Sequence, residues 1–102
     1  MDDQTFEKRA DEALQKLFDA LNGQEFEADF MAGALTVEFE DQGARFVISP
    51  NSPVRQVWIS ANVKSFKLDW DADREEFCLG GENLNEVVAG QISELLGEQV
   101  EL

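Results

Sequence analysis

The sequence contains no histidine and a single cysteine, Cys78. The absence of histidine removes the commonest transition-metal ligand and the usual general base. One cysteine cannot form a disulfide within the chain, which suits a reducing compartment. Cys78 also lacks a Cys or His partner for a zinc site or a nucleophilic pair, so we expect a small strand residue.

Basic residues are scarce as well. The chain has 8 Lys and Arg against 22 Asp and Glu, which gives a net charge of -14 in 102 residues. Binding to nucleic acid phosphates or to anionic membranes depends on Lys and Arg, so the balance argues against both. It favours cationic proteins or metal ions as partners, or mimicry of an acidic polymer.

Long apolar runs are missing too, since no stretch approaches the roughly 20 residues that cross a bilayer. The opening residues, MDDQTFEKRADE, have no apolar signal core and are too acidic for a transit peptide. We therefore expect a cytoplasmic protein, of bacterial type. A length of 102 residues with 43% hydrophobic content predicts one domain over residues 1–102.

Two segments have the apolar spacing of helices. The first begins near Asp2, Asp3 or Thr5 as candidate caps and ends at Asn22-Gly23. Its apolar stripe comprises Phe6, Ala10, Ala13, Leu14, Leu17, Phe18 and Leu21. The second begins with Asn83 and Glu86, which have the spacing of a capping box. Its stripe comprises Leu84, Val87, Val88, Ile92, Leu95 and Leu96, followed by Gly97.

Between these helices the apolar period changes to two, which is typical of strands. The strand candidates begin at Phe26 and continue at 35–40, 45–49, 54–60, 65–70 and 76–79, with turns at 41–43 and 71–73. Gly80-Gly81 ends the last of them. This order predicts an α+β fold, a two-layer α/β sandwich in which two helices pack on one face of an antiparallel sheet.

The segment SPNSPVRQVWISA, 49–61, is the most informative part of the chain. Strand alternation that turns Val57 and Ile59 into the core turns Gln56 and Trp58 to the opposite face. A tryptophan on the solvent face of a sheet needs an explanation, and a partner-binding surface is one. The alternative is that Trp58 packs on a loop or covers its neighbours. The segment lies in a window without acidic residues, 42–68.

Acidic residues gather before that window. Glu7 and Asp11 have the i, i+4 spacing of one helix face, whereas Glu25, Glu27 and Asp29 alternate as on one strand face. Carboxylate oxygens are hard ligands that iron accepts, but an open surface binds cations weakly and with poor selectivity. The alternative is a solvated acidic face.

A second acidic motif has the D-x-D-x-D spacing of a calcium loop, at Asp69, Asp71 and Asp73. The sixth position is Arg74 where such a loop needs Gly, and the twelfth is Gly80 where it needs Glu. The motif therefore predicts a turn between two strands.

Nearly the whole chain resembles the frataxin family. GALTVEFEDQGARFVIS is similar to the family's Gly-x-Leu-Thr-Val strand and its return strand, and PVRQVWIS to its Pro-x-x-Gln-Ile/Val-Trp-Leu signature. LDW resembles the following aspartate-containing strand, while FEKRADEALQKLFDAL and LNEVVAGQI resemble the two helices. The resemblance implies the sandwich fold and an iron-binding chaperone or regulator of iron–sulfur cluster assembly.

The resemblance also implies two sites. An acidic ridge would bind iron (Fe2+ or Fe3+) weakly, and by position it comprises Glu7, Asp11, Glu12, Asp19, Glu25, Glu27 and Asp29. A sheet surface would contact the cysteine desulfurase and scaffold assembly through Asn51, Gln56 and Trp58, with Lys67 at its edge. The implied protein is a monomer that iron could assemble into oligomers.

The chain departs from the family pattern at a few positions. Ser49 and Asn51 replace the usual Asn and Gln, Phe77 replaces a Trp, and the link at Gly80-Gly81-Glu82 is shorter. We expect no enzymatic activity, because the sequence offers no di-iron cage for the ferroxidase chemistry credited to some relatives. The alternative function is an acidic decoy that mimics nucleic acid and binds a basic protein.

Overall fold

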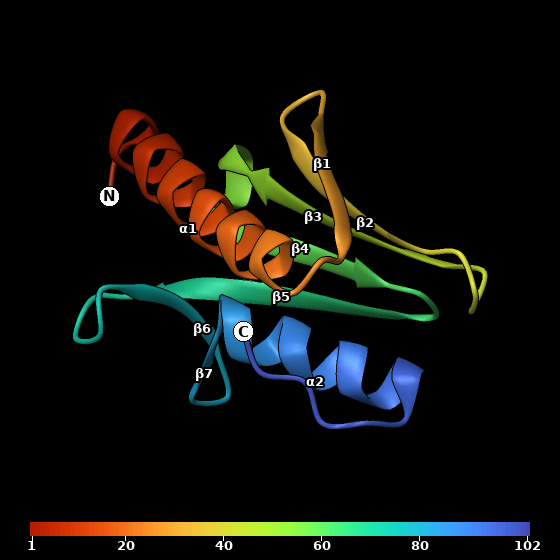
Figure 1. The fold of residues 1–102 in the computed structure, drawn as a ribbon. Helices are drawn as coiled ribbons and strands as arrows, with labels where there is room; N and C mark the ends of the chain where they lie inside the picture. Colours follow the sequence, from red (N-terminus) through yellow and green to blue (C-terminus); the bar gives the residue numbers. More distant parts are fainter.

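The computed structural model describes all 102 residues, which form one antiparallel sheet with two helices on the same face (Figure 1). The helices are α1 (Asp3–Gly23) and α2 (Leu84–Leu96). The strands are β1 (Glu27–Met31), β2 (Ala34–Phe39), β3 (Ala44–Asn51), β4 (Gln56–Ala61), β5 (Lys64–Asp71), β6 (Glu76–Leu79) and β7 (Glu82–Asn83). Each strand pairs with its neighbour in sequence, in the order β1 to β7. The predicted two-layer α+β sandwich is confirmed.

Helix α1 begins at an aspartate cap. The backbone N–H of Thr5 donates a 2.8 Å hydrogen bond to the Asp2 carboxylate, and this bond lowers the pKa of Asp2. The buried stripe of the helix is the one the periodicity predicts, with Phe6, Leu17 and Leu21 wholly inaccessible. The apolar face of α1 therefore anchors the first layer to the sheet.

Helix α2 has the predicted capping box, in which Asn83 and Glu86 each accept a backbone N–H of the other at 2.9 Å. Gly97 ends the helix in the left-handed conformation, at φ 70°. The chain then folds back, and the buried Val100 donates its N–H to the Ser93 hydroxyl at 2.9 Å. The C-terminal segment thus packs against α2.

The core lies between the helices and one face of the sheet. It includes Val37, Ile48, Ile59 and Leu68 from four adjacent strands, all at most 1% exposed. The Phe77 ring of β6 lies edge-on to Phe6 of α1, with their centroids 5.7 Å apart. No element covers the other face of the sheet, so its side chains are free to meet a partner.

Two local features differ from the sequence-based expectation. The strand predicted from Val54 begins at Gln56, because Ser52–Val54 forms a 3-10 turn and Arg55 adopts the left-handed conformation, at φ 50°. Gly80-Gly81 ends the strand at 76–79 as predicted, but these two glycines, with φ values of 57° and 84°, then turn the chain into the short β7, which was not predicted. Neither helix has the length and apolar character needed to cross a membrane.

Candidate functional site

The register of β3, β4 and β5 places the predicted contact residues side by side on the uncovered face. Trp58 of β4 lies between Ser49 of β3 and Lys67 of β5. The adjacent row consists of Asn51, Gln56 and Asp69 on the same three strands. These six residues are called the Trp58 patch below.

Polar contacts on both sides fix the Trp58 ring. The indole N–H donates a 3.0 Å hydrogen bond to Oε1 of Gln56, whose Nε2 in turn donates to Oδ1 of Asp69 at 3.0 Å. On the next strand, the Lys67 ammonium lies 4.8 Å from the centroid of the Trp58 ring. The ring remains partly exposed and is held in one orientation before any partner arrives.

The structure brings together all four residues predicted for this surface, Asn51, Gln56, Trp58 and Lys67. Sequence reasoning placed Lys67 at the edge, whereas it contacts the Trp58 ring directly. It missed Asp69 as a member of the patch. The sequence did contain a signal for Asp69, namely a two-residue hairpin turn at Asn62-Val63. Such a turn pairs Ala61 with Lys64, and the same antiparallel register pairs Gln56 with Asp69.

The centre of the uncovered face is poor in acid. The acid-free window coincides with β3, β4 and most of β5, and Asp69 is the one carboxylate of the Trp58 patch. A shallow groove of about 130 Å³ lies beside Trp58 and Lys67, along Ser49, Val47 and Ser60. An aromatic ring, small hydroxyls and a single ammonium suit contact with a partner protein. A dense layer of carboxylates would instead repel an acidic partner.

Acidic side chains of the predicted ridge on α1 lie exposed along one side of the helix. Asp11, Glu12 and Asp19 border the same shallow hollow. Two of the three have partners within the helix, since Glu12 accepts from Arg9 at 3.1 Å and Asp19 accepts from Gln15 at 3.0 Å. Asp11 is the acid of this group without such a partner.

The remaining ridge acids lie at both ends of the helix and on β1. Glu27 and Asp29 of β1 are exposed, because Ala28 between them turns toward the core. Glu25 occupies the connecting turn at φ 64°, and Glu7 is exposed on α1. All seven predicted residues are therefore accessible to solvent.

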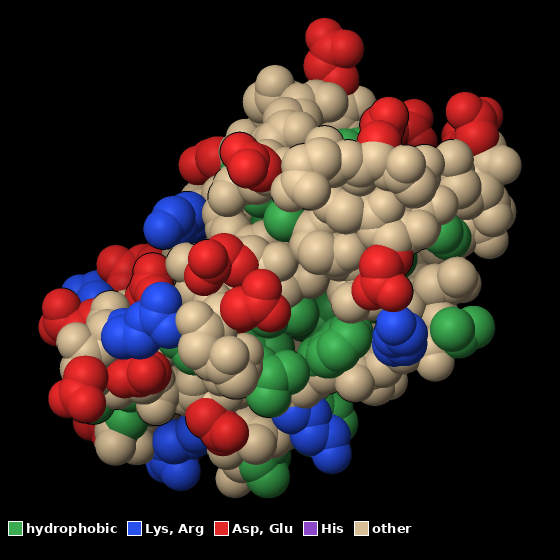
Figure 2. Space-filling model, turned by 90° about the horizontal axis from the view of Figure 1, so that it is seen from below, with side chains coloured by type: hydrophobic (Ala, Val, Ile, Leu, Met, Phe, Trp, Pro, Cys, Tyr) green, Lys and Arg blue, Asp and Glu red, His purple; other side chains and the backbone are tan.

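No group of three or more His, Cys, Asp or Glu side chains converges closely enough to hold a metal ion. On the side that carries α2, acidic side chains are spread widely, with small groups of Lys and Arg between them (Figure 2). The acids can raise the local concentration of cations through their combined charge, but they do not form a closed coordination shell.

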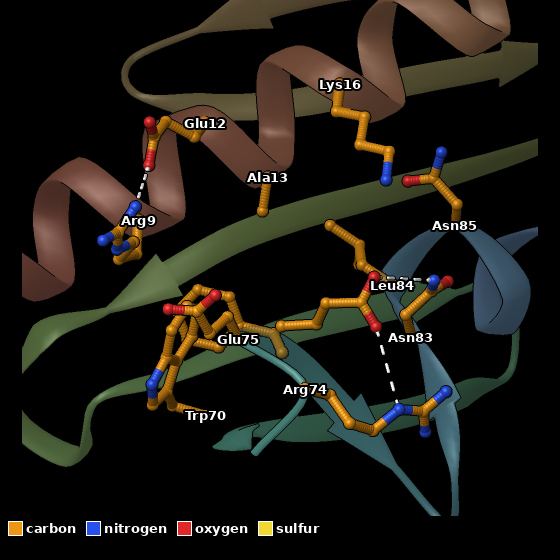
Figure 3. Close-up of a pocket in the computed structure, with 12 residues that line it drawn as sticks. Arg9, Glu12, Ala13, Lys16, Trp70, Arg74, Glu75, Asn83, Leu84 and Asn85 are labelled. Carbon is orange, nitrogen blue, oxygen red and sulfur yellow. Dashed lines mark hydrogen bonds and ion pairs between the residues drawn. The ribbon is translucent and has the colours of Figure 1, made fainter. Parts of the chain in front are cut away.

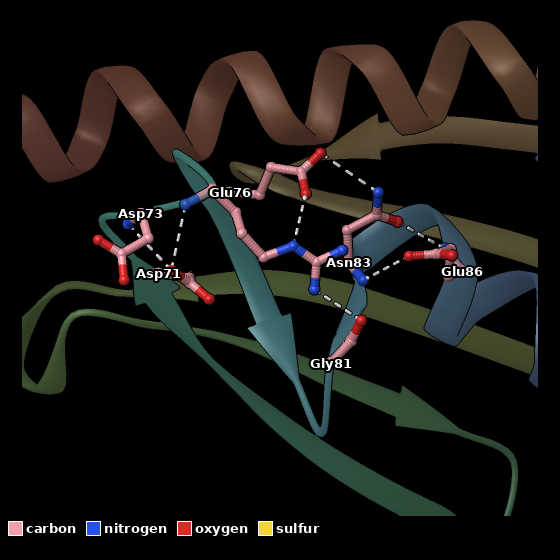
Figure 4. A network of polar contacts seen from close by, with 7 residues as sticks. Asp71, Asp73, Glu76, Gly81, Asn83 and Glu86 are labelled. Carbon is pink, nitrogen blue, oxygen red and sulfur yellow. Dashed lines mark hydrogen bonds and ion pairs between the residues drawn. The ribbon is translucent and has the colours of Figure 1, made fainter.

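The D-x-D-x-D motif forms a turn, as predicted. Oδ1 of Asp71 accepts the backbone N–H of Asp73 and of Arg74, at 3.0 and 3.2 Å, so this carboxylate is occupied by the turn itself (Figure 4). Cys78 lies on β6 opposite Asp69, partly buried, and burial raises the pKa of its thiol. Neither residue belongs to a group of three or more His, Cys, Asp or Glu side chains that could hold a metal ion.

Comparisons with known proteins agree with this architecture. The sequence matches the frataxin-like domain family over residues 1–98. It is 33% identical over 90 residues to the iron-sulfur cluster assembly protein CyaY of Pseudomonas putida strain GB-1, which covers 88% of this chain and 71% of that protein. The protein of the same name from Azotobacter vinelandii is 31% identical over 100 residues, covering 94% and 90%.

Among solved structures, a frataxin from Psychromonas ingrahamii has the same fold. It superposes with a TM-score of 0.81 at 23% sequence identity, covering 99% of this chain and 97% of that one. A match over this share of the chain includes both helices and the antiparallel sheet. The chain therefore belongs to the frataxin-like family.

Proposed function

We propose that this protein is a non-catalytic, iron-binding regulator of iron–sulfur cluster assembly that docks on the complex of cysteine desulfurase and scaffold protein. Its relatives from Pseudomonas putida and Azotobacter vinelandii are named as iron–sulfur cluster assembly proteins. The proposal extends that role to this chain and assigns it to two surfaces, the Trp58 patch and the acidic ridge.

The observation that carries the proposal is the preorganised Trp58 ring. An aromatic side chain on an uncovered face, locked by Gln56 and contacted by Lys67, has the properties of an interface anchor. Because the Trp58 side chain is already fixed, it loses less conformational entropy on binding than a mobile side chain would. We assign this patch to contact with the scaffold protein.

The acidic ridge supports the second half of the proposal. Its exposed carboxylates would attract a basic patch of the desulfurase and would bind iron as cargo, weakly and reversibly. Iron that neutralises ridge carboxylates would weaken the docking, which links iron supply to assembly. Such an open site suits sensing or delivery rather than storage.

An acidic decoy is the competing function, and the net charge of -14 is the observation that favours it. A nucleic acid mimic should carry charge along its whole contact face. Here the central strands of the uncovered face carry few acidic side chains, and none from 42 to 68, which favours the assembly role. The two functions differ in the partner that each requires, a desulfurase complex or a nucleic-acid-binding protein.

Cluster-assembly kinetics test the proposal. Purified desulfurase and scaffold protein are supplied with cysteine and several iron concentrations, with and without this protein. We expect the wild-type chain to change the assembly rate in an iron-dependent manner and Trp58→Ala to lose the effect. Val63→Ala is the control, because Val63 is 89% exposed at a turn outside the Trp58 patch. A rate that the wild-type chain leaves unchanged at every iron concentration would contradict the proposal.

A further inference from the structure

The Trp58 patch contains one carboxylate, that of Asp69 on β5, and no other acidic residue. Asp69 is exposed and takes part in none of the four ion pairs of the chain. The one hydrogen bond of its side chain comes from Nε2 of Gln56, which donates to Oδ1 at 3.0 Å. The register produces this contact, because Gln56 and Asp69 lie directly opposite each other on β4 and β5. The Asp69 carboxylate is therefore engaged with an amide rather than with a cation.

The Gln56 amide links Asp69 to the tryptophan. An indole N–H can only donate a hydrogen bond and an ionised carboxylate can only accept one, whereas an amide does both through different atoms. Gln56 accordingly accepts the Trp58 N–H at Oε1 and donates from Nε2 to Asp69, both at 3.0 Å. Rotating the amide by half a turn would bring its NH2 against the indole N–H and its oxygen against the carboxylate. One amide orientation therefore satisfies both neighbours, and the other satisfies neither.

The effect of Asp69 on the ring passes through Gln56, because no hydrogen bond joins Asp69 to Trp58. The ring is held at its N–H edge by Gln56, and the Lys67 ammonium lies over its face. We propose that Asp69 is a positioning residue, which holds the Gln56 amide in one orientation and thereby fixes the Trp58 indole. This orientation is a property of the free protein, whereas its use in binding a partner rests on the proposed function.

An ionised carboxylate suits this role better than a neutral group. The bond from Gln56 to Asp69 is exposed, so water competes for the amide N–H. A hydrogen bond to a charged acceptor is roughly twice as strong as one between neutral groups, which favours the carboxylate in this competition. A carboxylate also has no donor, so it does not compete with the indole N–H for Oε1 of Gln56. These properties account for an acid in a patch that otherwise lacks acids.

The test is hydrogen exchange of the Trp58 indole N–H, followed by NMR on the 15N-labelled full-length protein. We expect Asp69→Ala to speed this exchange about three- to tenfold, as for the loss of one hydrogen bond of ordinary net strength. Asp69→Asn should keep most of the protection, because its Oδ1 can still accept from Gln56. Asp69→Lys should lose the most protection, since an ammonium there would donate to Oε1 in competition with the indole.

Two controls accompany these variants. Trp70 is the internal reference, because it lies on the helix side of the sheet and lines a groove beside α1 (Figure 3). Its indole N–H should exchange at the wild-type rate in every variant. Glu82→Ala removes an exposed carboxylate of β7, outside the Trp58 patch, and should leave the exchange rate of Trp58 unchanged.

A double-mutant cycle tests whether Asp69 acts through Gln56. In a Gln56→Ala background, Asp69→Ala should have no further effect on the Trp58 exchange rate, since the link between the two side chains is gone. Additive effects in the double variant would overturn the proposal. An unchanged rate in Asp69→Ala alone would overturn it too, because water would then suffice for the Gln56 amide. So would equal rates in Asp69→Asn and Asp69→Ala, which would assign the effect to charge alone.

Cluster-assembly kinetics with the same variants separate this proposal from the proposed function. We expect Asp69→Ala to lose part of the effect that Trp58→Ala loses, and Asp69→Asn to retain it. Unchanged exchange in Asp69→Ala would overturn the positioning role whatever the assembly rate. Faster exchange in Asp69→Ala, together with a wild-type assembly effect in Trp58→Ala, would support the positioning role and contradict the proposed function.

Discussion

At the scale of single residues, the two tryptophans have different roles because they lie on opposite faces of the sheet. Trp70 packs edge-on against Phe77 with ring centroids 5.1 Å apart, on the side of the core. Trp58 stands on the uncovered face, where its contacts are a hydrogen bond to Gln56 and the Lys67 ammonium. Trp58 is thus available for binding, whereas Trp70 supports the fold.

Replacing Trp58 should therefore cost little stability. We expect Trp58→Ala to lower the free energy of unfolding by about 1 to 2 kcal/mol, because only part of the ring is buried. Phe77→Ala, at a position 2% exposed, should cost about 3 to 5 kcal/mol. Urea denaturation of both variants measures the difference. A loss for Trp58→Ala as large as that for Phe77→Ala would show that the ring belongs to the core.

Cys78 gives a second prediction at this scale. Because burial raises the pKa of its thiol, the folded protein holds less reactive thiolate at a given pH than the unfolded chain does. We expect iodoacetamide to alkylate the folded protein slowly at pH 7 to 8. The alkylation rate of the folded protein should rise at a higher pH than that of the chain unfolded in urea. Coincident pH profiles for the folded and unfolded chains would contradict this.

At the scale of elements, the cap of α1 links stability to pH. Because the hydrogen bond from Thr5 lowers the pKa of Asp2 in the folded state, the capping stabilisation is present above the unfolded pKa of Asp2. It is lost as the pH falls through the folded pKa. We expect Asp2→Ala to lower the melting temperature at pH 7, with a deficit that shrinks toward pH 2.

Asp11→Ala is the control for this prediction, since Asp11 is an exposed acid of the same helix that caps nothing. It should leave the melting temperature nearly unchanged at pH 7. A deficit for Asp2→Ala that is constant down to pH 2, or equal to that of Asp11→Ala, would show that the Asp2 carboxylate does not act as the cap.

Elements also show how far sequence reasoning reaches. Both helices and their caps follow from apolar periodicity and local hydrogen-bonding residues, so they were predictable. The start of β4 was not predictable. It follows a 3-10 turn at Ser52–Val54 and a left-handed Arg55, and no residue pattern in the sequence specifies these two backbone conformations. The place of Asp69 in the Trp58 patch follows from the register of the β4–β5 hairpin, which its turn at Asn62-Val63 indicates but apolar periodicity alone does not.

At the scale of the whole molecule, the acidic ridge and the Trp58 patch differ in charge. The ridge acids lie on α1 and β1 at one margin of the fold, while the central strands of the uncovered face carry few acidic side chains, and none from 42 to 68. The sequence predicted this difference from the window at 42–68. A basic partner and an uncharged or mildly acidic partner can therefore approach different surfaces of one small domain.

The affinity of the protein for purified cysteine desulfurase, measured over a series of salt concentrations, tests this account most directly. The variant Asp11→Lys, Asp19→Lys, Glu27→Lys should bind at least about tenfold more weakly at low salt, with a flatter salt dependence. The control Glu82→Lys, Glu98→Lys, Glu101→Lys changes the net charge equally but lies outside the ridge, so it should retain most of the affinity. Equal losses in both variants, or wild-type affinity in the first, would contradict docking through the ridge.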